Sequence, residues 1–148
     1  MKKTLLIIAI CFTTFLQAQT SKTKQQHEVQ QTVIKMFEAL SNRDSISLKT
    51  NCTSDVTFYE YGEIWTLDIL ISKAITTNTS SDFKRTNTFD FINTKTDKTS
   101  AWITYRLNST ISKEGKQTIV EWLETVILAK EKNQWKVKHL HSTVLKRI

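Results

Sequence analysis

The sequence predicts an α+β domain in which N-terminal helices pack on a strongly curved, mixed or antiparallel sheet. Apolar residues recur at helical spacing early in the chain, they alternate over four long segments of its second half, and short polar turns join those segments. Helices followed by a run of hairpin strands are typical of α+β folds. Proline is absent and glycine occurs only at positions 62 and 115, so no flexible linker divides the chain.

The first 18 residues have the order of a secretory signal peptide of the Gram-negative type. Lysines precede an apolar run from Leu5 to Phe15, and the small residue Ala18 stands where a signal peptidase cuts. The run is too short to span a bilayer stably, so we expect no stable membrane insertion. The sequence therefore predicts a cleaved segment, 1–18, and a single exported domain, 19–148, that is periplasmic or secreted.

Cleavage would leave Cys52 as the only cysteine, because Cys11 lies in the apolar run. No internal disulfide could then form, and the core must hold the fold together. Neither neighbour of Cys52 is a histidine or lysine that would lower the pKa of its thiol. We predict an inert, partly buried side chain, with a nucleophile or an interchain disulfide as the alternatives.

Three helices are predicted before the long strands. The segment His27–Leu40 carries apolar residues three and four positions apart, which is one face of an amphipathic helix. Asp44 or Ser45 is expected to cap a short second helix. The segment Trp65–Thr77 returns to helical spacing, with Thr66 as the expected cap.

Alternation of apolar and polar residues predicts the strands. A short strand, Val56–Tyr61, ends at Gly62. Four long strands follow, and their expected bounds are Phe83–Thr94, Ser100–Ser112, Thr118–Lys130 and Trp135–Leu145. The polar segments between the long strands are short, as hairpin connections require.

This order of elements resembles the NTF2-like superfamily, specifically the SnoaL-like and DUF4440-type small domains. Glu124-Thr125 and the later run Trp135–Ser142 resemble the closing hairpin of the group, which includes the association domain of calcium/calmodulin-dependent kinase II. The resemblance covers 25–145 in element order. It implies a cone whose pocket, in several relatives, holds a small apolar or carboxylate-bearing molecule, in some with an arginine on the penultimate strand. That stretch has no arginine here, which argues against carboxylate capture.

Strand parity suggests a proton-transfer pair. Glu124 shares a face with apolar residues, and His139 shares one with Trp135 and Val137, which we expect to point inward. We therefore expect Glu124 and His139 as catalytic residues, with Tyr105 orienting the substrate. The other expected pocket-lining residues are Phe37, Tyr59, Trp65, Trp122, Val126, Trp135 and His141. The alternative is that Glu124 and His139 only satisfy each other's hydrogen bonds.

Other chemistry has less support. Two histidines on one strand need a further ligand to bind a metal, and the remaining histidine, His27, begins the first helix. We predict no metal and no cofactor. No nucleophile motif is present, which favours non-catalytic binding of a small, largely apolar molecule. A cofactor-free isomerase, dehydratase or cyclase using the Glu-His pair, and an assembly module with a vestigial pocket, are the alternatives.

The strand that contains Glu124 is apolar on both faces, and Trp102 lies on the outer face of the strand before it. One cone cannot cover both sides of its own sheet, so we predict a homodimer through the outer sheet face. The formal net charge is +7, and the basic residues gather near the C-terminal hairpin. Because the chain is predicted to be exported, nucleic acid is not an expected partner.

Overall fold

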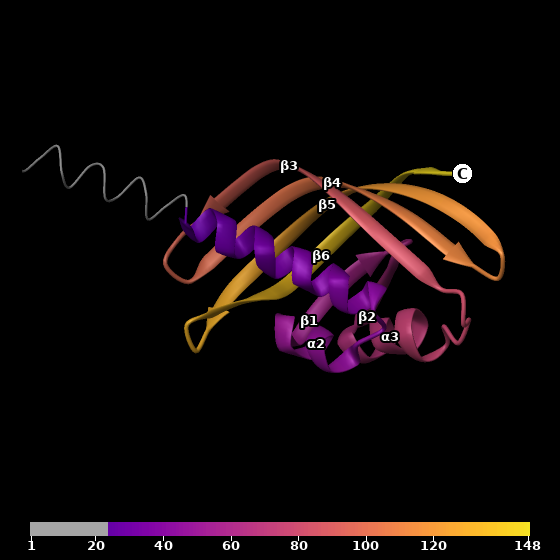
Figure 1. Cartoon of the computed structure of the whole chain (residues 1–148). Helices are drawn as coiled ribbons and strands as arrows, with labels where there is room; N and C mark the ends of the chain where they lie inside the picture. Colours follow the sequence, from indigo (N-terminus) through magenta and orange to yellow (C-terminus); the bar gives the residue numbers. More distant parts are fainter. Residues whose placement is uncertain (1–23) are drawn as a thin grey trace, which may run out of the picture.

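A computed structural model describes residues 24–148, so the predicted signal peptide lies outside the described residues. Within this range, helices pack on one face of a single six-stranded sheet that curves around them and remains open (Figure 1). The long first helix, drawn in indigo, crosses the concave face of the sheet. The predicted α+β architecture, with N-terminal helices on a strongly curved mixed sheet, is confirmed.

The helices form where the spacing predicts them. The first helix covers 24–41 of the described residues and buries its apolar stripe. Helix α2 (Ser45–Asn51) is capped by the Asp44 carboxylate, which accepts hydrogen bonds of 3.0 and 2.9 Å from two backbone amides of its first turn. Helix α3 (Leu67–Ile71) begins at the Thr66 cap and continues into a π-helical turn, η1 (Ser72–Thr76).

The six strands follow the order β2-β1-β6-β5-β4-β3 in the sheet. Their bounds are β1 (Cys52–Glu60), β2 (Glu63–Thr66), β3 (Lys84–Thr96), β4 (Ser100–Lys113), β5 (Lys116–Glu131) and β6 (Gln134–Arg147). Neighbouring strands are antiparallel, except that β1 and β6 are parallel. Strand β2 was not predicted, because its four residues precede a helical pattern directly and none of them is buried.

Two-residue turns close three of the hairpins. Both central residues have positive φ at Tyr61-Gly62 (52° and 78°), Glu114-Gly115 (55° and 70°) and Lys132-Asn133 (48° and 65°). This is the type I′ geometry, whose twist matches that of the flanking strands. The turn at Tyr61-Gly62 positions β2 antiparallel to β1, at the edge of the sheet.

A β-bulge in β6 reverses the alternation of its side chains. Ile127 and Leu128 pair with His139 and Val137, which leaves Lys138 as an extra residue. Before the bulge Val137 is buried, whereas after it the buried positions are Leu140 and Ser142. His139 and His141 therefore lie on the outer face of the sheet. The prediction that they face the pocket is wrong, because strict parity cannot be carried through a bulge.

Candidate functional site

A cavity of about 430 Å³ opens between the helices and the concave face of the sheet. The first helix contributes apolar side chains, the α3–η1 segment closes one side and contributes Lys73, and the sheet supplies the other charged groups. The lining residues used below are Phe37, Glu60, Tyr61, Trp65, Lys73, Arg85, Lys113, Trp122, Glu124 and Arg147. A cavity of this size with aromatic walls and a few polar groups is typical of small-molecule sites.

Glu124, on β5, is the most deeply buried carboxyl of the site, with 2% of its surface exposed. Its Oε1 accepts a 3.0 Å hydrogen bond from the Ser142 hydroxyl of β6. Its Oε2 has no partner, and neither has the hydroxyl of the cross-strand residue Tyr105. Burial raises the pKa of Glu124 to about 7, although the Tyr105 and Ser142 hydroxyls and the Arg85 charge lower it in part.

Glu60 brings a second carboxyl into the same cavity. It stands at the end of β1, which pairs with β6. Burial and the charge of Glu124 raise the pKa of Glu60 to about 7, and the Ser142 hydroxyl and Arg85 oppose this shift. Because the charge of Glu124 raises the pKa of Glu60, the two carboxyls titrate as a coupled pair near neutral pH.

Arg85, on β3, is one of four cations that line the cavity, and its charge interacts with both carboxyls. Its Nε donates to Asn87 Oδ1 at 2.9 Å and its Nη2 to Ser109 Oγ at 3.2 Å. The guanidinium also lies over the rings of Phe37 and Trp122, at 5.3 and 5.5 Å from their centroids. Burial lowers the pKa of Arg85, and the neighbouring charges of Glu124 and Glu60 raise it. Among residues 24–148 no ion pair joins Arg85 to a carboxylate.

The mouth of the cavity combines aromatic rings with cations. Lys73 lies 4.7 Å from the Trp65 ring centroid and forms a 3.3 Å ion pair with Glu63. The Trp65 indole N–H donates to the same Glu63 carboxylate at 2.6 Å. Beside them, the Tyr61 ring centroid lies 6.2 Å from that of Trp65, and Nη2 of Arg147 donates to the Tyr61 hydroxyl at 2.6 Å. These contacts hold both aromatic rings at the rim.

The structure brings some of the predicted site residues together. Phe37, Trp65, Trp122 and Glu124 all line the cavity. Tyr105 is completely buried and does not line the cavity, but it lies against Glu124 and Phe37. Glu124 is therefore in the predicted place, with hydroxyl groups as its neighbours instead of a histidine.

Other predicted residues lie elsewhere. His139 pairs with Thr57 Oγ1 through Nδ1 at 2.8 Å, and the rings of His139 and His141 contact Tyr59 on the outer face. A Glu124–His139 proton exchange is therefore not possible in this arrangement. Val126 is part of the core. Trp135 lines a separate hollow beside His27, near the beginning of the first helix.

The sequence analysis missed the rim cations Lys73, Lys113 and Arg147, and among the more buried residues of the site it missed Glu60, Arg85 and Ser142. Strand alternation could have identified Glu60 and Arg85. Glu60 lies on the same face of β1 as the buried residues Val56 and Phe58, and Arg85 lies on the same face of β3 as Phe89. Ser142 had no such signal, since the bulge decides its face.

Cys52 is fully buried in the core, and burial raises the pKa of its thiol to about 12. A thiol with this pKa is not a nucleophile near neutral pH, which agrees with the prediction of an inert side chain. Among the described residues, no group of three or more histidine, cysteine, aspartate and glutamate side chains is placed to hold a metal ion.

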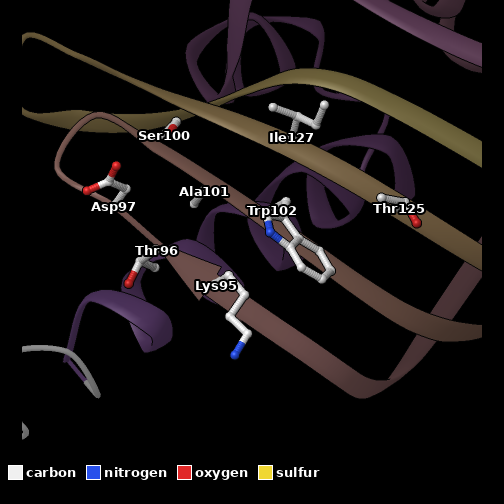
Figure 2. A pocket seen from close by; sticks show the side chains of 8 residues that line it. All are labelled: Lys95, Thr96, Asp97, Ser100, Ala101, Trp102, Thr125 and Ile127. Carbon is white, nitrogen blue, oxygen red and sulfur yellow. The ribbon is translucent and has the colours of Figure 1, made fainter.

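A second hollow, of about 470 Å³, lies on the outer side of the sheet. Figure 2 shows the indole of Trp102 on β4 beside Ile127 and Thr125 of β5, with Lys95 of β3 on its other side. This hollow contains one exposed aromatic ring and the buried Thr96 hydroxyl, which has no partner, but its lining includes no buried carboxyl or guanidinium. The cone cavity is therefore the better candidate site.

No helix in the part of the chain that the structure describes is long and apolar enough to cross a membrane. A comparison with curated proteins found no match.

Solved structures share the fold at low sequence identity. A putative scytalone dehydratase from Novosphingobium aromaticivorans is 13% identical, with a TM-score of 0.72 over 85% of this chain and 87% of that chain. A ketosteroid isomerase-like protein from Erwinia carotovora atroseptica is 13% identical, with a TM-score of 0.67 over 82% and 97%. The CaMKII hub homology domain of Chlamydomonas reinhardtii is 20% identical, with a TM-score of 0.69 over 81% and 98%.

These relatives include proteins named as enzymes and a hub domain, so the shared fold leaves the activity open. The family model described as SnoaL-like domain matches residues 29–146, which is most of the chain. The chain therefore belongs to the SnoaL-like domain family.

Proposed function

We propose that the protein binds a small, largely apolar molecule in the cone cavity without transforming it. The observation that carries this proposal is the cavity of about 430 Å³, whose walls include the rings of Phe37, Trp65 and Trp122. Aromatic walls provide most of the binding free energy for an apolar ligand, and a few polar groups orient it. The Glu60 and Glu124 carboxyls are the polar groups of this kind beside the aromatic walls.

Native mass spectrometry of protein purified from the envelope of its own host tests this proposal. We expect a retained small molecule. Ala74→Phe, which adds a ring inside the cavity, should abolish its retention, whereas Ile69→Phe at an exposed position of α3 should not. Equal retention by both variants would show that the molecule is bound elsewhere.

A proton-transfer enzyme is the second candidate, and the paired carboxyls favour it. Glu60 and Glu124 share one cavity and both have a pKa of about 7. Near neutral pH one carboxyl can donate a proton while the other accepts one, which is the requirement for an isomerase or dehydratase. In this proposal Glu60 takes the role that the sequence suggested for His139, and Tyr105 keeps its place beside Glu124.

Isotope exchange distinguishes the two candidates. A panel of small cyclic ketones and enones is incubated with the protein in D₂O, and exchange next to the carbonyl is followed by NMR. An enzyme should catalyse exchange that Glu124→Gln removes, whereas a binding protein should leave the rate at that of the buffer.

Homodimerisation through the outer sheet face is a further proposal. On this face Trp102 pairs with Ile127, Ile127 pairs with His139, and the side chains of Trp102 and Ile127 are 41% and 44% exposed. An uncharged, partly apolar row of this kind is complementary to a second copy of itself.

Export remains a proposal as well. It is supported by the sequence of residues 1–18. Amino-terminal sequencing of protein from the host envelope should find Gln19 as the first residue.

A further inference from the structure

We propose that the cone cavity takes a small organic anion, whose charge is bound by Arg85 and whose apolar part lies against Phe37 and Trp122, and that the Glu60–Glu124 pair takes up a proton as the anion binds. This inference rests on the proposed binding function and adds the chemical class of the ligand.

The protein uses only some of the N–H donors of the Arg85 guanidinium. A guanidinium carries five N–H groups in one plane. The protein uses the Nε group for Asn87 and one Nη2 group for Ser109, and within residues 24–148 no protein acceptor binds Nη1. A cation at a cavity wall with free coplanar donors fits the oxygens of a carboxylate or a sulfonate.

Arg85 is also held in position before any ligand binds. Ser109 donates to Asn87 Oδ1 at 2.6 Å, and Asn87 Nδ2 donates to Ser41 Oγ at 2.9 Å, so its two acceptors are themselves fixed. The rings of Phe37 and Trp122 contact the guanidinium. A ligand that reaches Arg85 must therefore pass beside aromatic rings, which favours an anion with an apolar body.

The carboxyl pair explains how an anion can enter a cavity that already contains two acidic groups. Glu124 and Glu60 both interact with the Arg85 charge. An arriving anion competes for that charge and repels both carboxylates, so it favours their protonated form. Binding is then coupled to proton uptake, and by linkage the affinity falls as pH rises.

The other titratable groups around the pair do not supply this coupling. The first helix faces the pair with apolar Phe37 and Leu40. At the rim, Lys73 and Lys113 form ion pairs with Glu63 and Glu114, at 3.3 and 3.6 Å. The remaining groups are Tyr105 of β4, Tyr61 after β1 and Arg147 of β6, and Arg147 is bonded to Tyr61. Burial keeps the pKa of Tyr105 well above its usual value, so this phenol stays neutral.

The test compares two probes of the same shape. The first, 2-naphthoate, carries a carboxylate, and the second, 2-naphthylmethanol, is neutral. Dissociation constants are measured by fluorescence at pH 6, 7 and 8 for the wild type, for Arg85→Gln, and for Arg106→Gln as an exposed control on the outer face. Calorimetry at pH 7 in buffers of different ionisation enthalpy measures proton uptake.

We expect naphthoate to bind about tenfold more tightly than the alcohol at pH 6, as one charge-assisted contact permits. Its affinity should fall about tenfold from pH 6 to pH 8 with uptake of up to one proton, and the affinity of the alcohol should stay constant. Arg85→Gln should remove the preference, and Arg106→Gln should retain it. In Glu124→Gln the pH dependence should weaken.

The outcomes separate the two proposals. If the two probes have equal dissociation constants and Arg85→Gln changes neither constant, the anion inference is overturned while the proposed binding function stands. A preference for naphthoate that survives Arg85→Gln would place the anion at the rim cations and would also overturn it. If neither probe binds, both proposals fail for ligands of this size.

Discussion

The Ser142 hydroxyl of β6 donates a 3.0 Å hydrogen bond to Oε1 of Glu124 on β5. The two residues are direct cross-strand partners and both are buried. Without the bulge at Lys138, a histidine would stand on this face instead. Ser142 gives the carboxyl a neutral neighbour, so Glu124 keeps a raised pKa where a protonated histidine would lower it.

Replacing Ser142 tests this contact. Ser142→Ala removes the donor and leaves a second buried carboxylate oxygen without a partner, so we expect a loss of about 1–3 kcal/mol in the free energy of unfolding above pH 7. At pH 5 Glu124 is protonated, and the loss should be smaller. Urea unfolding at the two pH values measures the difference, and Thr143→Ala on the outer face is the matched control.

The stability of the wild type should fall with rising pH. The pKa of Glu124 is raised from 4.5 to about 7 in the folded state, so the folded protein binds more protons than the unfolded chain between these values. The stabilisation is complete below pH 4.5 and is lost as pH rises to about 7, with a total of about 3 kcal/mol. Glu60 acts in the same direction.

Glu124→Gln provides the comparison for that curve. The variant should show a weaker decline between pH 5 and pH 8 and should be more stable than the wild type at pH 8. Equal slopes for the two proteins in urea unfolding would contradict the raised pKa of Glu124.

The bulge itself can be tested by deletion. Removing Lys138 takes out the extra residue and makes Val137 and His139 direct neighbours, so strict alternation is restored with Leu140 and Ser142 still inward, and we expect the cooperative unfolding transition to be retained. Lys138→Ala keeps the bulge and removes only an exposed ion pair with Asp55, which is worth about 1 kcal/mol or less. Circular dichroism and thermal unfolding of the two variants distinguish removal of the bulge from loss of the charge.

Neighbouring residues of β5 test the assignment of faces. Leu128→Ala, at a fully buried position, should cost about 2–5 kcal/mol. Ile127→Ala, at a side chain that is 44% exposed, should change the stability of the monomer little. In the proposed homodimer Ile127→Asp should weaken association, as measured by sedimentation velocity over a concentration series. If sedimentation shows only monomers at all concentrations, the dimer proposal is overturned.

Cys52 should resist thiol reagents in the folded protein. Its side chain is buried and its pKa is about 12, so a chain with Cys11→Ser should react with a chromogenic disulfide reagent only at the rate of unfolding. Denaturation should expose one reactive thiol. Fast reaction of the native protein would show that the β1 end of the sheet opens.

Periodicity and turn chemistry were sufficient for much of the fold. The amphipathic stripe of the first helix, the caps Asp44 and Thr66, and the alternation around Ile103 and Tyr105 each depend on residues close together in sequence. Local backbone preferences and burial of one face decide such features, which is why the α+β class and the inward position of Glu124 could be predicted from the pattern of residues.

The site depended on relationships that no local pattern contains. Because β6 contains one extra residue, Leu140 lies on the concave face and His139 does not. The parallel pairing of β1 with β6 places Glu60 in the same cavity as Glu124. Arg85 reached the same cavity from the far edge strand. These neighbours could not be predicted from sequence patterns, because strand register and sheet order depend on hydrogen bonds between segments that are distant in the chain.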